Sequence, residues 1–153
     1  MRWTSIRRAA RLIYLNKTCY NGLFRVNSKG FFNTPFGRYD KPNFVDAANL
    51  SACSKALTTA DIREGSFESV LSSACAGDLV YFDPPYAPVS DTAYFTSYSK
   101  LGFGQDMQVR LRDVCAELDR KGVRFMLSNS AVPFILNLYS RFRVETVFAS
   151  RAV

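Results

Sequence analysis

The segment Leu79 to Pro88, LVYFDPPYAP, joins a continuous apolar run to an acid, two prolines and a tyrosine. Asp83 precedes a proline and is therefore held in the extended region, while Pro84 and Pro85 have fixed φ angles and no backbone N–H. The bend presents hydrogen-bond acceptors without donors, namely the Asp83 carboxylate and the Pro84 carbonyl. The ring of Tyr86 adds a flat amphipathic surface beside these acceptors.

Acceptors of this kind suit a substrate that supplies two N–H groups, such as the amino group of a planar ring. The nitrogen of such a group is a poor nucleophile because its lone pair is delocalised into the ring. Two acceptors that bind its two hydrogens would favour the pyramidal nitrogen that attacks, which is electrostatic catalysis by preorganised groups. The alternative interpretation is a proline turn that merely ends a strand.

The bend needs a buried strand before it, and the surrounding chain predicts an α/β sheet. Leu79 to Phe82 is a short apolar run bounded by turn residues, which is typical of a central parallel strand covered on both faces. In open α/β sheets, ligands bind outside the carboxyl ends of such strands, where Asp83 stands. Further strands are expected at Ala60 to Arg63, Val123 to Leu127 and Phe142 to Ala149.

Helices are expected between these strands, so the chain should form right-handed crossovers. The predicted helices comprise residues 4–15, 46–60, 67–75 and 131–140, and one more that begins near Met107. This last helix should end at Gly122. Its apolar stripe consists of Met107, Leu111, Val114, Cys115 and Leu118. Residues 16–42 and 86–104 are predicted loops, and the first is too aromatic to be a disordered linker.

Positive charge is concentrated at one end of the sequence. Residues 1–41 contain nine Lys or Arg and one acid, whereas the remaining 112 residues contain eleven basic and twelve acidic side chains. A solvated face is one explanation for such a cluster. A segment this one-sided, and rich in Arg, Asn and Tyr, more often contacts phosphate, which indicates a nucleic-acid partner.

The composition excludes several classes of site and of protein. There is no histidine, and the four cysteines are far apart, so zinc binding and histidine-based catalysis are not expected. The cysteines are expected to be reduced and mostly buried. No run of 18 apolar residues occurs, and the basic N-terminus lacks the apolar block of a secretory signal, so we expect a cytoplasmic protein that does not bind membranes.

Several separated motifs resemble those of Dam-type DNA adenine-N6 methyltransferases, of the D12 class. These motifs are LNKTCYNGLFRVNSKGFFNTPFGRY at 15–39, GDLVYFDPPY at 77–86, FTSY at 95–98, DMQVRLRD at 106–113 and LSNS at 127–130. The resemblance implies a Rossmann-like S-adenosylmethionine-dependent methyltransferase sheet with a loop-rich target-recognition insertion. It divides the chain into a recognition segment at residues 1–59 and part of the catalytic domain at residues 60–153.

The resemblance implies that an adenine is flipped out of duplex DNA and that its N6 accepts the methyl group of S-adenosylmethionine, with no metal. Asp83 and the Pro84 carbonyl would receive the N6 hydrogens, Pro85 would complete the bend, and Tyr86 would stack on the base. Asp83 would also lie against the methyl donor. Gly65 to Phe67 reads Gly-Ser-Phe where relatives usually have Gly-Asp-Phe, so Ser66 and Phe67 are the implied contacts to the adenine of the methyl donor.

The resemblance also implies DNA contacts in the recognition segment. Tyr20 and Asn21 match positions that wedge into the base stack. Base-contacting positions correspond to Leu23, Arg25, Pro35 and Tyr39, and backbone-contacting positions to Asn27 and Arg38. Arginine is the usual bidentate reader of guanine, while a surface arginine and a hairpin turn at Asn21-Gly22 are the plain alternatives. Relatives with this segment generally methylate GATC, which is the expected target.

The family carries a Gly-rich loop for the methyl donor ahead of its recognition segment, and the sequence given shows none. We therefore expect a fragment that lacks both ends of the enzyme, with marginal stability and no activity by itself. A non-catalytic DNA-binding remnant is the main alternative. Enzymes that methylate cytosine N4 or a glutamine amide are weaker rivals, because they more often have Ser or Asn in place of Asp83.

Overall fold

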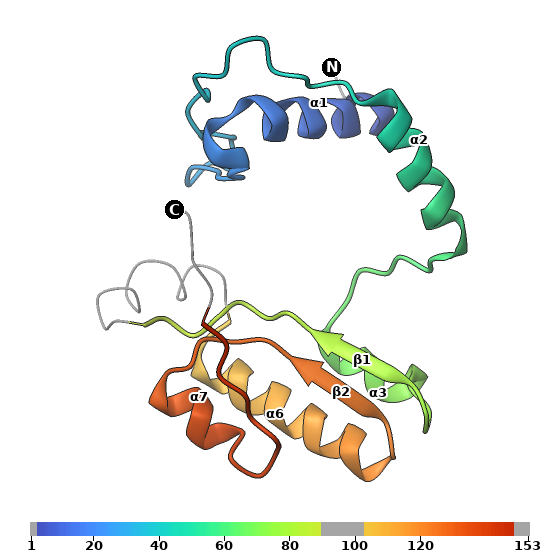
Figure 1. The fold of residues 1–153 in the computed structure, drawn as a ribbon, viewed down its shortest axis with the longest axis vertical. Helices are drawn as coiled ribbons and strands as arrows, with labels where there is room; N and C mark the ends of the chain where they lie inside the picture. Colours follow the sequence, from blue (N-terminus) through green and yellow to red (C-terminus); the bar gives the residue numbers. More distant parts are fainter. Residues whose placement is uncertain (1–2, 90–102, 149–153) are drawn as a thin grey trace. The chain divides into compact units, whose positions relative to one another are not determined.

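The computed structural model describes residues 3–89 and 103–148, and the chain forms two compact units, Met1–Ile62 and Arg63–Val153. Each unit has its own local architecture (Figure 1). Among the described residues, no helix has the length and apolar character required to cross a bilayer.

The first unit contains two helices joined by a long loop. Helix α1 (Ser5–Thr18) begins at the cap Thr4, whose hydroxyl accepts a hydrogen bond from the Arg7 amide at 3.3 Å. This confirms the predicted helix and extends it by three residues. Its apolar stripe is little covered, since Ile6 is 80% exposed. Helix α2 (Ala47–Ala56), capped by Asp46 and continued by a 3-10 turn at Leu57–Thr59, confirms the predicted helix at 46–60.

The loop between these helices folds back on the end of α1. The Tyr20 amide donates to the Pro35 carbonyl and the Gly37 amide to the Thr18 carbonyl, both at 2.8 Å. A side chain at Gly37 would place its Cβ 2.7 Å from the Cys19 carbonyl oxygen, so this close approach requires glycine. A second reversal pairs Val26 with Phe32. The predicted loop therefore has a defined backbone path, whose regular structure is limited to the last turn of α1 and a 3-10 turn at Tyr20–Gly22.

The second unit contains a parallel two-stranded sheet. Strand β1 (Leu79–Phe82) pairs with β2 (Arg124–Leu127), with Leu79 opposite Arg124 and Phe82 opposite Leu127. Helix α6 (Gln105–Arg120) packs against this sheet. Two short helices complete the unit, α3 (Val70–Ser73), which follows a 3-10 turn at Phe67–Ser69, and α7 (Pro133–Leu138). The unit is a mixed helix-and-strand fold, as the sequence predicts.

The core of this unit is built on the stripe of α6. Leu111, Val114, Cys115 and Leu118 are buried as expected, together with Phe82, Val123, Ile135 and Tyr139 from the neighbouring elements. The positive φ of Gly122 ends the helix and turns the chain into β2.

Two predicted strands are wrong within the described residues. Neither Ala60 to Arg63 nor Phe142 to Phe148 forms a strand, although both were expected to join the sheet. A short extended segment becomes a strand only when a neighbour supplies a hydrogen-bonding ladder, and β1 and β2 pair only with each other here. Most of the predicted loop at 86–104, and Ala149, lie outside the described residues.

Within the described residues, β1 is covered on one face, whereas a central strand of the complete predicted sheet would be covered on both. Phe82 is buried on the α6 side, whereas Leu79, Tyr81 and Met126 are 60–65% exposed on the other side. An apolar sheet face without a covering layer is a hazard for aggregation, which is consistent with the expected marginal stability of the isolated chain.

All four cysteines are free, as predicted. Only Cys19 and Cys115 are buried, while Cys53 and Cys75 are exposed, so the expectation of mostly buried thiols holds for two of them. Burial raises the pKa of the Cys115 thiol to about 12, which makes this side chain an inert part of the core.

The difference between buried and exposed apolar side chains leads to a stability prediction for two leucines, Leu118 on α6 and Leu79 on β1. Leu118→Ala should destabilise the chain by about 2–5 kcal/mol because Leu118 is fully buried. Leu79→Ala should change the free energy of unfolding by no more than ~0.5 kcal/mol because Leu79 is 65% exposed. Urea unfolding monitored by circular dichroism measures both. Equal costs for the two substitutions would show that the described core is wrong.

Candidate functional site

The acid of the DPPY bend lies at the carboxyl edge of the sheet. Asp83 follows the last residue of β1 and Ser128 follows the last residue of β2, so the register of the strands places them side by side. The Ser128 hydroxyl donates a hydrogen bond to Asp83 Oδ1 at 3.0 Å. The Tyr81 hydroxyl lies 3.1 Å from Ser128 Oγ. Because the Ser128 hydroxyl already donates its hydrogen to Asp83, Tyr81 is the donor in the hydrogen bond between Tyr81 and Ser128.

The acceptors of the bend remain available to a ligand. The Asp83 side chain is exposed, and within the described residues its Oδ2 and the Pro84 carbonyl have no hydrogen-bond donor. Tyr86 is half-buried beside them. The backbone after the prolines is held by two side-chain amides, since Gln108 donates to the Pro85 carbonyl and Asn129 accepts from the Ala87 amide, both at 2.9 Å. The bend thus has fixed neighbours and an open acceptor face.

Sequence reasoning assigned no role to the residues that hold the bend. Ser128 and Asn129 belong to the LSNS segment, which contributes to the family resemblance but predicts no role for either side chain. Gln108 stands three residues before Leu111 on the buried stripe of α6, and it is only 1% exposed. A polar residue at a buried position of an apolar stripe was the signal that could have identified it, because buried amides need partners.

The residues predicted to contact the methyl donor lie at the start of a 3-10 turn. The Ser66 hydroxyl accepts from the Glu68 amide and donates to the Glu68 carboxylate at 3.0 Å, which leaves one lone pair for another donor. Hydrogen bonds from Arg110 and then Ser66 lower the pKa of Glu68. Phe67 is half-buried and packs edge-on against Phe103, with 5.9 Å between the ring centroids, so part of its ring belongs to the core.

The predicted wedge of the recognition segment is a tight turn that exposes its side chains. Asn21 and Gly22 both have positive φ angles, of 50° and 64°, which confirms the turn signal of this dipeptide. The Asn16 side chain donates to the Gly22 carbonyl at 2.8 Å and holds the turn against α1. Tyr20 and Leu23, on either side, are more than half exposed.

The predicted guanine reader, Arg25, is held by a neighbour on the opposite side of the second reversal. Its Nε donates to Asn33 Oδ1 and its Nη2 to the Asn33 carbonyl, both at 3.1 Å. These bonds leave Nη1 and one hydrogen of Nη2 for a ligand. The guanidinium can therefore offer its Nη1–Nη2 end to a ligand, whereas its Nε–Nη2 side is bound to Asn33. Asn33 was not singled out from the sequence, because only the fold brings it beside Arg25.

The remaining predicted DNA contacts are spread along the same loop. Asn27 Oδ1 accepts from the amides of Lys29 and Phe31, so this side chain shapes the turn and keeps only its Nδ2 group for a ligand. The Pro35 carbonyl accepts from Tyr20, and Arg38 and Tyr39 are exposed. The predicted site residues therefore form two sets, a recognition set in the first unit and a catalytic and cofactor set in the second.

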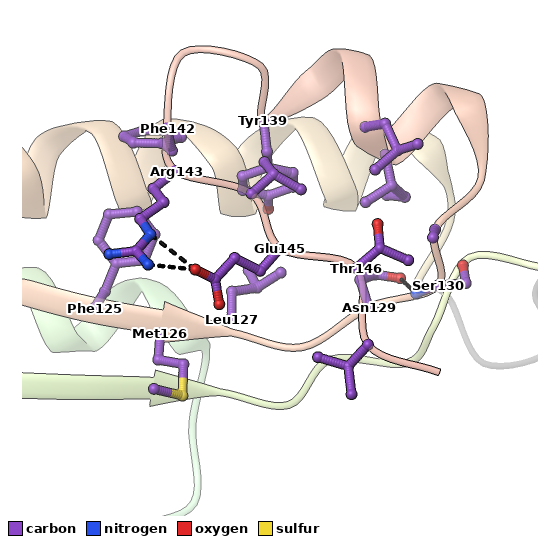
Figure 2. Close-up of a pocket in the computed structure, with 15 residues that line it drawn as sticks. Phe125, Met126, Leu127, Asn129, Ser130, Tyr139, Phe142, Arg143, Glu145 and Thr146 are labelled. Carbon is purple, nitrogen blue, oxygen red and sulfur yellow. Dashed lines mark hydrogen bonds and ion pairs between the residues drawn. The ribbon is translucent and has the colours of Figure 1, made fainter. Parts of the chain in front are cut away.

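A cavity of about 610 Å³ in the second unit does not include the predicted catalytic residues. It lies between β2, α7 and residues 143–147 (Figure 2), where Arg143 pairs with Glu145. Apolar side chains form much of its wall, and the buried Tyr139 hydroxyl near it has no hydrogen-bond partner in the described part of the chain. Because neither Asp83 nor Pro84 lines this cavity, we place the candidate site at the bend, where the hydrogen-bond acceptors lie.

Comparisons with known proteins identify the family. The family described as D12 class N6 adenine-specific DNA methyltransferase matches residues 2–153. A type II methyltransferase of Methanocaldococcus jannaschii is 48% identical over 149 residues, 97% of this chain and 52% of the relative. A type II methyltransferase of Lactococcus lactis subsp. cremoris is 46% identical over 150 residues, 97% of this chain and 53% of the relative.

A DNA adenine methylase of Escherichia coli K12 is 36% identical over 147 residues, which is 96% of this chain and 52% of that protein. The chain thus spans about half the length of these three relatives, and the similarity extends over almost all of its own residues. The chain therefore belongs to the D12 class N6 adenine-specific DNA methyltransferase family.

Proposed function

We propose that this chain is the recognition and catalytic portion of an enzyme that methylates N6 of adenine in duplex DNA, within GATC. Residues 1–59 would read the DNA, and residues 60–153 would belong to a Rossmann-like catalytic domain. The observation that carries the proposal is a pair of acceptors at the carboxyl edge of parallel strands, namely Oδ2 of the exposed Asp83 and the carbonyl of the half-buried Pro84. This is the edge where α/β sheets bind ligands.

The acceptor pair explains how an exocyclic amine becomes a nucleophile. Asp83 and the Pro84 carbonyl would each accept one hydrogen of the adenine N6, which draws the nitrogen lone pair out of conjugation with the ring. Because Ser128 already holds Asp83 Oδ1, the carboxylate is oriented before the base arrives. Tyr86 would stack on the base after it leaves the duplex, and Pro85 maintains the bend.

The described residues fit S-adenosylmethionine in part. When bound, this cofactor supplies a methyl group on a sulfonium that is ready for nucleophilic attack. Asp83 would contribute an exposed carboxylate to its site, Ser66 one lone pair for an amino group, and Phe67 a half-buried ring. Among the described residues, no three His, Cys, Asp or Glu side chains gather as a metal site would require.

The recognition set supports a duplex DNA partner. Arg25 would read guanine in the major groove with the end of its guanidinium. Tyr20 and Asn21 would enter the stack at the tight turn and replace the flipped base. Leu23, Pro35 and Tyr39 would contact bases, and Asn27 and Arg38 the phosphate backbone. The excess of basic residues in this part of the chain supplies the general attraction to DNA.

The proposal is tested with a joined enzyme, in which this chain replaces the matching segment of the Methanocaldococcus jannaschii relative. Labelled S-adenosylmethionine and a GATC duplex should yield N6-methyladenine, identified by mass spectrometry of the digested DNA, and a duplex without GATC should yield little. If the joined enzyme folds and binds duplex in a salt-sensitive manner without any transfer, the non-catalytic DNA-binding remnant becomes the better account.

A further inference from the structure

Two side-chain amides from different elements, one buried and one half-buried, form a hydrogen-bonded pair behind the bend. We call Gln108, on α6, and Asn129, after β2, the amide pair. Asn129 Nδ2 donates to Gln108 Oε1 at 3.1 Å, Gln108 Nε2 donates to the Pro85 carbonyl, and Asn129 Oδ1 accepts from the amides of Ala87 and Ser130. Three separate segments of the chain are thereby held at one point.

The bend needs such external partners because of its prolines. Pro84 and Pro85 have no N–H, so the backbone after β1 cannot be fixed by donating to a neighbouring strand. The amide pair supplies a donor to the Pro85 carbonyl and an acceptor for the Ala87 amide. The Ser130 hydroxyl adds a donor to the Ala87 carbonyl at 2.5 Å. These contacts lie immediately after the Pro84 carbonyl, whose direction they determine.

The position of Gln108 is a costly one for an amide. Its neighbours along the same helical stripe are Leu111, Cys115 and Leu118, and all of them are fully or almost fully buried. Burying an amide among such residues is unfavourable unless each polar atom is paired, and here both are. A leucine or methionine would fill this place without that requirement, so what the amide adds is its two directional bonds.

We propose that Gln108 and Asn129 are positioning residues, which set the direction of the Pro84 carbonyl toward the reacting amine. This inference rests on the proposed function of the bend. Neither side chain needs to touch the base or the methyl donor, because the pair acts through the backbone of Pro85 and Ala87. Misplacement of a reacting group by about 1 Å can cost about 10²-fold in rate, so the expected effect is on the chemical step.

The test is Gln108→Met in the joined enzyme, because methionine has a similar length and can make neither hydrogen bond. With enzyme in excess and at saturation, the single-turnover rate constant should fall about 10- to 100-fold, while the Kd for duplex stays within about twofold. This first-order constant does not depend on how much enzyme is folded, so a purely structural role would leave it unchanged. Asn137→Met, which removes an exposed side-chain amide on α7, is the matched control and should have little effect.

A second variant and a second measurement keep the outcome clear. Asn129→Asp should slow the same step, because a carboxylate would compete with the Pro85 carbonyl for the Gln108 Nε2 donor. This variant serves as the test if Gln108→Met does not fold. Hydrogen exchange of the Ala87 amide should accelerate in Gln108→Met, whereas Asn129→Asp keeps an oxygen acceptor for that amide. An unchanged single-turnover constant in an otherwise active joined enzyme overturns the positioning role, whereas a joined enzyme without N6 methylation overturns the proposed function instead.

Discussion

Asp83→Asn is expected to lower the single-turnover methylation rate of the joined enzyme by about 10²–10³-fold or more, with duplex affinity within about twofold. The amide has the shape of the carboxylate but less negative charge, and it can present an N–H to the amine instead of an acceptor. The loss should therefore appear in the chemical step. Binding should persist because the predicted DNA contacts lie in the other unit.

The matched control for this substitution is Asp113→Asn, which removes an exposed carboxylate paired with Arg112 on the surface of α6. Exposed pairs of this kind contribute little, so the control should keep its rate. Measurement of both rate constants under single-turnover conditions, together with duplex titration, separates the two effects. If Asp83→Asn weakens duplex binding and spares the rate constant, Asp83 does not have the role assigned to it.

Arg25→Ala should relax sequence preference at one base pair of the target. Loss of a bidentate contact to guanine corresponds to about 1–3 kcal/mol of discrimination, or roughly 5- to 150-fold in the preference for that base. Asn33→Ala should give part of the same relaxation, because it removes the side-chain Oδ1 that accepts from Arg25 Nε and keeps only the backbone carbonyl that accepts from Nη2. Competition among duplexes that vary each base of GATC in turn measures the change.

Arg38→Ala provides the comparison for Arg25→Ala within the same loop. As a predicted phosphate contact, Arg38 should affect all sequences equally, and its loss should reduce the salt dependence of binding. An unchanged preference in Arg25→Ala, or relaxation in Arg38→Ala, would reverse the two assignments.

Local patterns predicted the positions of most elements. The apolar run of β1 ends at Phe82 as expected, and the α6 stripe is buried at four of its five predicted positions, with Met107 half-buried. The helix at the start of the chain and the turn at Asn21-Gly22 also follow from local signals, namely apolar residues at helical spacing and two residues that tolerate positive φ. Such signals involve residues close in sequence, which is why they can be read without a structure.

Pairing between distant segments was less predictable. The segments at 60–63 and 142–148 have the composition of strands, but their pairing depends on partners that a local pattern does not contain. The contacts of Asp83 with Ser128, and of Gln108 with Asn129, join residues 45 and 21 positions apart. The DPPY motif predicted the bend as the candidate site, and only the fold identified the side chains that hold it.

The most direct test of the central claim is the structure of the joined enzyme bound to a GATC duplex and a non-reactive analogue of the methyl donor. The account predicts that the target adenine lies outside the helix, with its N6 about 2.7–3.2 Å from both an Asp83 carboxylate oxygen and the Pro84 carbonyl oxygen. A flipped adenine whose N6 is bound by other groups, with Asp83 directed away from it, would contradict the account.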